Sequence, residues 1–255
     1  MMKINNLEKF LEKIRRGEPA FGCCITFADS AVTEVACAAG FDFVWIDGEH
    51  GEHDRLEAMH HLMAVKGTDT ASLYRVPSCD HTQIKRIIDF APAGIIVPLV
   101  MNAADAERAL RACRYPPEGD RGCGFRRGLD YGAGDFKAYW EASKHDPLVI
   151  IQIEHIEAVR NLDEILKLPI DSILVGPYDL TASLNKEGQW HDPEVMAIFD
   201  EVCSKARAAG KILGVYTECD FDLWKRRGVQ YFSVKNDTSA MLMGFRSMID
   251  AARKA

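Results

Sequence analysis

Eight short apolar stretches recur along the chain, and segments with helical periodicity separate them. The stretches are rich in β-branched residues and apolar on both faces, which is typical of parallel strands covered by helices. Regular alternation of eight strands with helices favours a closed (β/α)8 barrel, the TIM barrel. The predicted strands are Phe21–Phe27, Phe43–Ile46, Ala71–Val76, Gly94–Pro98, Leu148–Ile153, Ser172–Val175, Ile212–Val215 and Tyr231–Val234.

The predicted helices fill the intervals and extend to both ends of the chain. A length of 255 residues suits one such barrel, and no polar linker divides the chain, so we expect a single domain over 1–255. An open, doubly wound sheet is the alternative, but its Gly-x-Gly-x-x-Gly turn after the first strand is absent. The helices are Asn5–Arg16, Ala31–Ala39, Arg55–Lys66, Thr82–Phe90, Ala104–Cys113, Leu162–Leu168, Val195–Ala209, Asp222–Arg226 and Asn236–Arg253.

Charge and composition exclude several classes of protein. The net charge of −7 disfavours binding to nucleic acid or to an anionic membrane. No apolar run approaches the roughly 18–20 residues of a transmembrane helix, and the first residues lack the apolar core of a signal peptide. The eight cysteines are scattered and form no Cys-x2-Cys pair, which argues against a zinc ribbon and a disulfide framework. We expect a cytoplasmic protein.

One irregular stretch is long, from Arg114 to about Gly134. Long loops in compact domains commonly act as lids or binding loops. Because it comes after the fourth strand, we expect it on the face where barrel active sites lie. Arg121, Arg126 and Arg127 are then either contacts for an anionic substrate or solvated side chains.

Acidic, basic and imidazole side chains gather where the predicted strands end. Barrel enzymes carry their chemistry at the carboxyl ends of the strands, whereas the opposite ends of these strands offer few charged residues. This asymmetry predicts an enzyme. The set comprises Asp47 and His50 after the second strand, Arg75 on the third, Gln152 and Glu154 at the fifth, and Asp179 after the sixth.

Glu154 and Asp179 follow successive strands, which lie about 4.8 Å apart in a sheet. Two carboxylates so close repel unless a cation lies between them or one is protonated. Oxygen ligands favour Mg²⁺ or Mn²⁺. An ion pair between Glu154 and Arg75 is the structural alternative. Nearby, Gly176 allows the backbone to approach a ligand, and Pro177 suits the first position of a short helix.

Five motifs together resemble those of the 4-hydroxy-2-oxoheptanedioate aldolase family, which are class II pyruvate aldolases. Their barrel superfamily also contains citrate lyase beta-like proteins and 2-dehydro-3-deoxyglucarate aldolases. The order and spacing hold from about residue 20 to 240. The motifs are Ile46–His50, Val97–Val100 with Asn102 and Ala103, Arg114–Pro117, Gln152–Glu154 and Gly176–Leu180.

The resemblance implies a metal-bound pyruvate half-site. Glu154 and Asp179 match the residues that bind the divalent metal, for which Mg²⁺, Mn²⁺ and Co²⁺ are candidates. The metal chelates pyruvate through its carboxylate and keto oxygens, close to the position of Gln152. Arg75 matches the arginine that contacts the keto oxygen and stabilises the charge of the enolate. A guanidinium and a metal are suited to a developing oxyanion.

The resemblance also implies an acid/base group and an assembly. His50 matches the histidine that exchanges a proton with the hydroxyl at C4, and an imidazole does so near neutral pH. Asp47 and Asp89 match aspartates that assist this histidine. Family members form homo-hexamers, as trimers of dimers that swap a helix, so the helix Asn236–Arg253 is expected to exchange between subunits.

Gly176, Pro177 and Tyr178 are expected to contact the substrate. Many relatives carry Ala at the position of Tyr178 and Ser at that of Thr181, and both positions lie where the aldehyde partner would bind. We therefore expect the chain to cleave and form the C3–C4 bond of a 4-hydroxy-2-oxo acid, giving pyruvate and an aldehyde.

Three other functions stay open at this point. An enzyme akin to macrophomate synthase would decarboxylate oxaloacetate and pass the same enolate to another electrophile. A Schiff-base aldolase would need a nucleophilic lysine at the site, and Lys235 is the only lysine at the carboxyl end of a predicted strand. A non-catalytic barrel could bind a small acid as a sensor.

Overall fold

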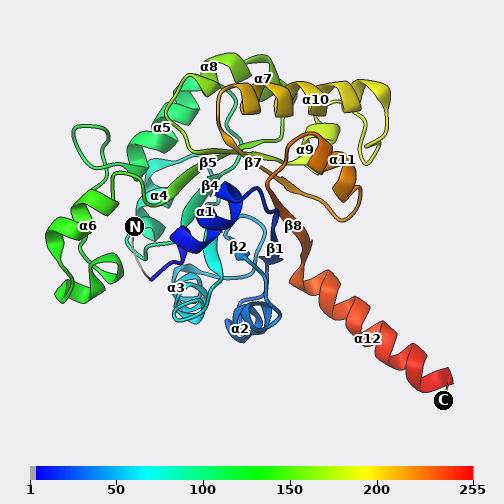
Figure 1. The fold of residues 1–255 in the computed structure, drawn as a ribbon, viewed down its shortest axis with the longest axis horizontal. Helices are drawn as coiled ribbons and strands as arrows, with labels where there is room; N and C mark the ends of the chain where they lie inside the picture. The colour runs from blue at the N-terminus through cyan, green and yellow to red at the C-terminus, as the bar shows by residue number, and fades with distance from the viewer. Residues whose placement is uncertain (1–3, 255) are drawn as a thin grey trace.

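A computed structural model describes residues 4–254 and contains a closed barrel of eight parallel strands (Figure 1). Each strand pairs with its neighbours in sequence, and the last pairs with the first. The predicted fold class is confirmed, and each predicted strand ends within two residues of the observed one. The strands are β1 (Ala20–Ile25), β2 (Phe43–Asp47), β3 (Ala71–Arg75), β4 (Gly94–Val97), β5 (Leu148–Ile153), β6 (Ser172–Val175), β7 (Ile212–Tyr216) and β8 (Tyr231–Asn236).

Helices surround the barrel, and several begin at a side chain that caps them. Asp54 accepts two backbone N–H groups at the start of α3, and Asp80 does the same for α4, whereas Asn102 accepts one at the start of α5. The helices are α1 (Leu7–Arg15), α2 (Ala31–Ala38), α3 (Arg55–Ala64), α4 (His81–Ile88), α5 (Ala103–Cys113), α6 (Phe136–Ala142), α7 (Ile156–Arg160), α8 (Leu162–Leu166), α9 (Pro177–Ala182), α10 (Pro193–Ala208), α11 (Phe221–Arg226) and α12 (Asp237–Lys254), with a 3₁₀ turn η1 at Arg127–Gly132.

Helix α1 lies across the amino end of the barrel (Figure 1). Leu7, Phe10 and Ile14 are buried against the interior, and the Phe10 ring packs edge-on against Phe43 and Tyr231 at 5.7 and 5.6 Å. Burying such a side chain contributes about 1.5–3 kcal/mol. With this end closed by apolar side chains, the barrel interior opens at the carboxyl ends of the strands.

The long loop lies elsewhere than predicted. It follows α5 rather than β4 directly, so it connects a helix to the next strand at the amino ends of the strands. Arg121 and Arg127 are buried: Arg121 donates to the Tyr139 hydroxyl at 3.2 Å, and Arg127 donates to two backbone carbonyls at 2.7 Å. Arg126 is exposed. The buried pair supports the loop, and none of the three arginines faces the cavity described below.

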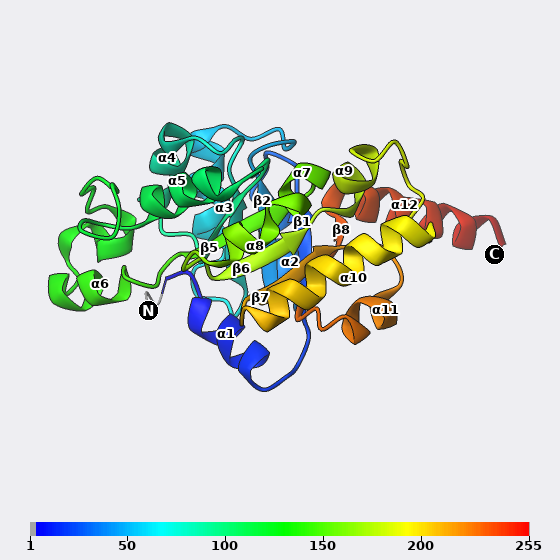
Figure 2. The same ribbon diagram turned by 90° about the horizontal axis from the view of Figure 1, so that it is seen from above.

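Helix α12 projects away from the barrel (Figures 1 and 2). It begins at the buried Asp237, whose carboxylate accepts hydrogen bonds from Thr26 and Phe27 after β1. Beyond this anchor its apolar side chains are exposed, namely Met241, Leu242, Met243, Phe245, Met248 and Ile249. Within residues 4–254, no helix is long and apolar enough to cross a membrane.

Candidate active site at the carboxyl ends of the strands

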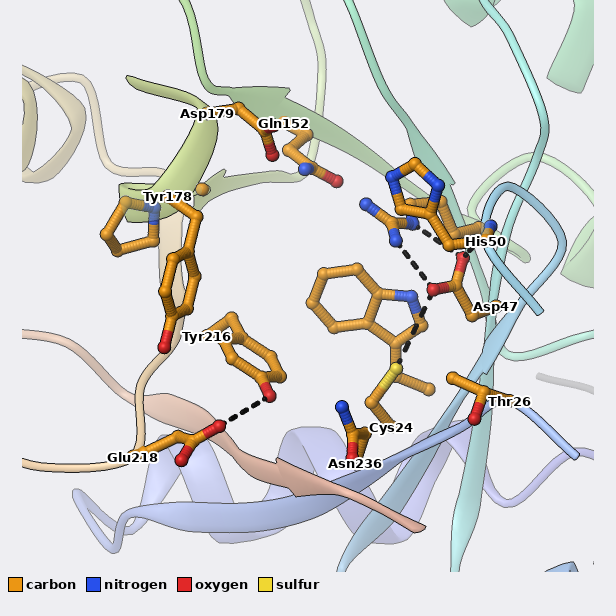
Figure 3. A pocket seen from close by; sticks show the side chains of 14 residues that line it. Cys24, Thr26, Asp47, His50, Gln152, Tyr178, Asp179, Tyr216, Glu218 and Asn236 are labelled. Atoms are coloured by element: carbon orange, nitrogen blue, oxygen red, sulfur yellow. Dashed lines mark hydrogen bonds and ion pairs between the residues drawn. The ribbon is translucent and has the colours of Figure 1, made fainter. Parts of the chain in front are cut away.

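A cavity of about 450 Å³ opens at the carboxyl ends of the strands (Figure 3). Eight residues predicted from the sequence line it: Asp47, His50, Arg75, Gln152, Gly176, Pro177, Tyr178 and Asp179. Six further residues complete the lining, namely Cys24, Thr26, Trp45, Tyr216, Glu218 and Asn236. Its size lies within the range of small-molecule sites.

Arg75 is fixed by two acids and an indole. In the parallel register Asp47 lies opposite Arg75, and the guanidinium donates to both carboxylate oxygens of Asp47 at 2.8 and 2.6 Å. Its third nitrogen lies 2.8 Å from Oε2 of Glu49. The guanidinium also lies over the Trp45 ring, 4.8 Å from its centre. A planar group held on three sides is oriented before any substrate arrives.

Asp47 also organises the turn that carries His50. Its Oδ1 accepts the backbone N–H groups of Glu49 at 3.1 Å and His50 at 3.3 Å. Burial acts to raise the pKa of Asp47, but the hydrogen bonds and charge of Arg75 outweigh it, and the net shift lowers that pKa. Asp47 therefore stays ionised, and it positions Arg75 and the backbone before His50 rather than the imidazole itself.

His50 stands on the exposed part of this turn and lines the cavity. Figure 3 shows His50 and Asp47 on one side, with Tyr178 and Tyr216 on the other. Space for a substrate thus separates the imidazole from the aromatic side chains.

Glu154 is buried just after β5, behind the cavity surface. Its Oε1 accepts the backbone N–H of Leu99 at 2.7 Å, and its Oε2 accepts the Gln152 amide. Leu99 has φ of +54°, a strained conformation for a residue with a side chain, which directs its N–H at the carboxylate. Burial raises the pKa of Glu154 to about 7, and the charge of Asp179 adds to the effect.

Arg75 binds Asp47 and Glu49 rather than Glu154, so the ion pair considered as an alternative is not formed. Among the described residues, no Lys or Arg forms an ion pair with Glu154 or Asp179. Oε1 of Gln152 is also buried without a hydrogen-bond partner among the described residues.

These oxygen donors fit a hard divalent cation. In the part of the chain that the structure describes, no three His, Cys, Asp or Glu side chains form a ligand group by themselves. The chain thus offers two carboxylates, Glu154 and Asp179, with the Gln152 amide oxygen beside them. Mg²⁺ commonly binds through one or two carboxylates and fills its other positions with water and substrate.

Asp89 lies away from this site, contrary to its predicted role beside His50. It is the C-cap of α4, so it lies toward the amino ends of the strands, where it lines a separate cavity with Arg126 and Arg127. Its Oδ1 is 3.7 Å from a nitrogen of Arg121. Within one chain, Asp89 and His50 line different cavities.

Tyr216, Glu218 and Asn236 are site residues that the sequence reasoning missed. They end or follow β7 and β8, so the rule that located Asp47 and Glu154 would also have found them. The motif series did not extend to these strands. Tyr216 directly follows the apolar residues of its strand, so nothing in the sequence distinguishes it from them. Glu218 accepts the Tyr216 hydroxyl at 3.2 Å and lies 2.5 Å from Lys235.

Comparison with known proteins places this chain in a family. Residues 21–225 match the family described as HpcH/HpaI aldolase/citrate lyase. The chain belongs to this family. Aldolases and citrate lyases are carbon–carbon lyases, and the resemblance predicted from the motif series is confirmed.

Individual HpcH/HpaI relatives cover nearly the whole chain. The hydroxypyruvate/pyruvate aldolase of Roseobacter denitrificans is 35% identical over 84% of each chain. The 5-keto-4-deoxy-D-glucarate aldolase of Salmonella gallinarum is 32% identical over 96% of this chain and 97% of its own. The crystal structure of an HpcH/HpaI family protein from Burkholderia cenocepacia matches with a TM-score of 0.87 and 26% identity, covering 95% of this chain and 98% of that one.

Proposed function

We propose that this protein is a class II aldolase that cleaves and forms the C3–C4 bond of a 4-hydroxy-2-oxo acid, giving pyruvate and an aldehyde. The observation that carries the proposal is the position of Arg75. Its guanidinium is held rigidly in a cavity that also contains His50 and Asp179. Relatives named as aldolases of pyruvate, hydroxypyruvate and a keto-deoxy sugar acid support the same chemistry.

The proposed cofactor is Mg²⁺ or Mn²⁺, with Co²⁺ as a third candidate, held by Glu154 and Asp179 next to Gln152. When bound, it would supply Lewis-acid stabilisation of negative charge on the keto oxygen. The support is the pair of carboxylates without a cation partner among the described residues, together with the unpartnered Oε1 of Gln152. Burial is the main cause of the raised pKa of Glu154, and a bound cation would lower that pKa.

Two roles in cleavage fall to side chains of the protein. The C4 hydroxyl must lose its proton as the bond breaks, and His50, which lines the cavity, would accept it. The electrons of the broken bond pass to the pyruvate half, where Arg75 stabilises the charge on the keto oxygen. Asp47 holds Arg75 and the turn of His50 in place. Gly176 and Pro177 form the wall next to Gln152, because a Cβ at Gly176 would lie 3.1 Å from its Nε2.

A Schiff base at Lys235 is disfavoured by its contacts. The ammonium pairs with Glu218, and Lys235 does not line the cavity. A Schiff-base lysine must be a free amine that faces the substrate. Borohydride treatment in the presence of pyruvate should therefore leave the mass of the protein unchanged.

We also propose that the protein is a homo-hexamer, a trimer of dimers that exchange α12. The exposed apolar side chains of α12 support this, because a helix that projects from a barrel gains most of its stability by packing against a partner.

The proposed reaction is tested by incubating the protein with pyruvate, Mg²⁺ or Mn²⁺ and a panel of aldehydes, with product masses as the readout. The expected result is a metal-dependent product whose mass is the sum of pyruvate and the aldehyde. If no aldehyde reacts while oxaloacetate is decarboxylated, the enzyme is instead of the kind related to macrophomate synthase. Binding of pyruvate without any turnover would identify a sensor.

A further inference from the structure

An aromatic wall forms the side of the cavity opposite His50 (Figure 3). Tyr178 projects from α9 and Tyr216 from the end of β7, with ring centres 6.0 Å apart. Trp190 packs edge-on against Tyr178 at 4.8 Å, and Trp45 against Tyr216 at 6.2 Å. The four rings make a continuous row from Trp190 through Tyr178 and Tyr216 to Trp45, and the Trp45 ring contacts the Arg75 guanidinium.

The wall is held in a fixed orientation but remains open to a ligand. The Tyr216 hydroxyl donates to Glu218, which fixes the direction of its ring. Tyr178 keeps 48% of its surface exposed although Trp190 covers one side. A half-exposed aromatic side chain at the mouth of a cavity offers apolar area that a ligand can bury.

The charges around this wall disfavour an anion. Arg75 is the only Lys or Arg among the described residues that line the cavity, and the proposed mechanism uses it for the keto oxygen of the pyruvate half. Lys235 is neutralised by Glu218. A second carboxylate on the aldehyde partner would therefore meet Glu218 and Asp179 without a free cation to bind it, and like charges disfavour a ligand.

The cavity also has more room than pyruvate needs. Its volume of about 450 Å³ is typical of sites for larger small molecules, and pyruvate fills only a small part of it. The rings of Tyr178 and Tyr216 form part of the boundary of the remaining space, together with polar side chains.

We propose that Tyr178 and Tyr216 form the subsite for the aldehyde and select an uncharged aldehyde that carries an aromatic ring. This inference rests on the proposed aldolase function. In the synthetic direction the methyl carbon of pyruvate loses a proton and bonds to the aldehyde carbon, whose oxygen takes up a proton. The ring of the aldehyde packs against the two tyrosines while its carbonyl points toward His50.

The first test compares kcat/KM for benzaldehyde, acetaldehyde and glyoxylate at saturating pyruvate and Mg²⁺, with product mass as the readout. The wild-type protein should prefer benzaldehyde to glyoxylate. Tyr178→Leu and Tyr216→Leu should each lower the ratio of benzaldehyde to acetaldehyde about tenfold, the upper value of one aromatic contact. A general loss of structure would lower both rates together and leave the ratio unchanged.

Tyr131→Leu is the matched control, because Tyr131 is 66% exposed and lines a different cavity. Its ratio of kcat/KM for benzaldehyde to that for acetaldehyde should equal the wild-type ratio. Tyr178 is itself half-exposed, so Tyr178→Leu should fold even if Tyr216→Leu does not. Unchanged ratios in tyrosine variants that keep the wild-type rate with acetaldehyde, or a wild-type preference for glyoxylate, would overturn the subsite.

Glu218→Gln tests the charge argument separately. Removing this carboxylate also frees Lys235, so kcat/KM for glyoxylate should rise several-fold relative to acetaldehyde. A ratio that does not rise would contradict the exclusion of anions. Failure of the aldolase proposal is distinguishable, because then no aldehyde would react and pyruvate would not exchange its methyl protons with solvent.

Discussion

In the proposed mechanism His50 and the pyruvate half-site serve different steps, so replacing His50 should affect two reactions unequally. Aldol cleavage needs a base for the C4 hydroxyl, whereas decarboxylation of oxaloacetate releases CO2 with no such proton to remove. His50→Ala should lower aldol cleavage by about 10²–10⁴-fold, the usual contribution of a positioned acid/base. It should keep most of any oxaloacetate decarboxylase activity. Both rates are measured on one preparation at saturating metal.

His60→Ala is a suitable control, because this histidine is exposed on α3 and does not line the cavity. Its two rates should match those of the wild type. Equal losses of both activities in His50→Ala would mean that His50 supports the metal or the fold. An unchanged rate of aldol cleavage would remove it from the mechanism.

A buried histidine should make the stability of the protein depend on pH. His61 is fully buried on α3, with Nδ1 2.7 Å from the Thr33 hydroxyl, and burial lowers its pKa to about 4. In the unfolded chain the pKa of a histidine is about 6.5. Between these two pKa values the unfolded chain binds the proton and the folded chain does not. The contribution of the neutral His61 to stability is therefore present above pH 6.5 and is lost as the pH falls toward 4.

Lowering the pH from 7.5 to 5 should therefore reduce the free energy of unfolding by about 2 kcal/mol through His61 alone. Urea unfolding of the wild type and His61→Asn at both pH values measures this contribution. Between pH 7.5 and pH 5, the free energy of unfolding of the variant should fall by about 2 kcal/mol less than that of the wild type. Parallel losses would show that His61 does not titrate differently in the two states.

Residues at the ends of strands could be placed from the sequence, because strand ends in a parallel barrel meet on one rim. That rule located Asp47, Arg75 and Gln152 correctly. It could not show that Glu49 shares Arg75, since the partner of a guanidinium depends on side-chain directions. Nor could it separate Asp89 from the site, because only the three-dimensional path of α4 puts its end on the other face.

At the scale of elements, the start of α9 is packed closely on the end of β5. A Cβ at Gly176 would lie 2.9 Å from Cβ of Glu154 and 3.3 Å from its Oε2. Gly176→Ala should therefore displace the carboxylate and weaken Mn²⁺ binding about 10-fold or more, as loss of support around a metal ligand commonly does. Isothermal titration calorimetry measures the affinity.

Gly122→Ala is the matched control for this substitution. A Cβ there would meet only the side chain of Lys85, at the ordinary contact distance of 3.6 Å. Its Mn²⁺ affinity should equal that of the wild type. If Gly176→Ala binds Mn²⁺ as tightly as the control does, the metal is not held beside this turn.

The eight strands and nine of the helices could be predicted to within two residues, because buried parallel strands are continuously apolar and helices keep their period. The five-residue helix α7 was not predicted, and neither was the segment between α5 and β5. Its 3₁₀ turn η1 includes Asp130 and Tyr131 with positive φ, and its small apolar cluster brings Tyr115 against Tyr139. Such contacts are specific to tertiary structure and leave no periodic signal in the sequence.

The whole molecule should be larger than one chain if α12 packs against a partner. Met241, Phe245 and Met248 recur at helical spacing on its exposed surface. A charge there would be buried in a subunit contact, so Phe245→Asp should shift the mass measured by light scattering from an oligomer toward a monomer. Ser247→Asp, which adds the same charge at a polar position, should leave the mass unchanged. A monomeric wild type would contradict this assembly.

The proposed mechanism depends on a divalent cation at Glu154 and Asp179, which would enable this chain to form the enolate of pyruvate. The exchange of the methyl protons of pyruvate for deuterium in D2O, followed by proton NMR, tests this dependence. Exchange should stop in excess EDTA and return when Mg²⁺ is restored to the wild type. Glu154→Gln should not recover at the same Mg²⁺ concentration. Undiminished exchange in excess EDTA would contradict the claim.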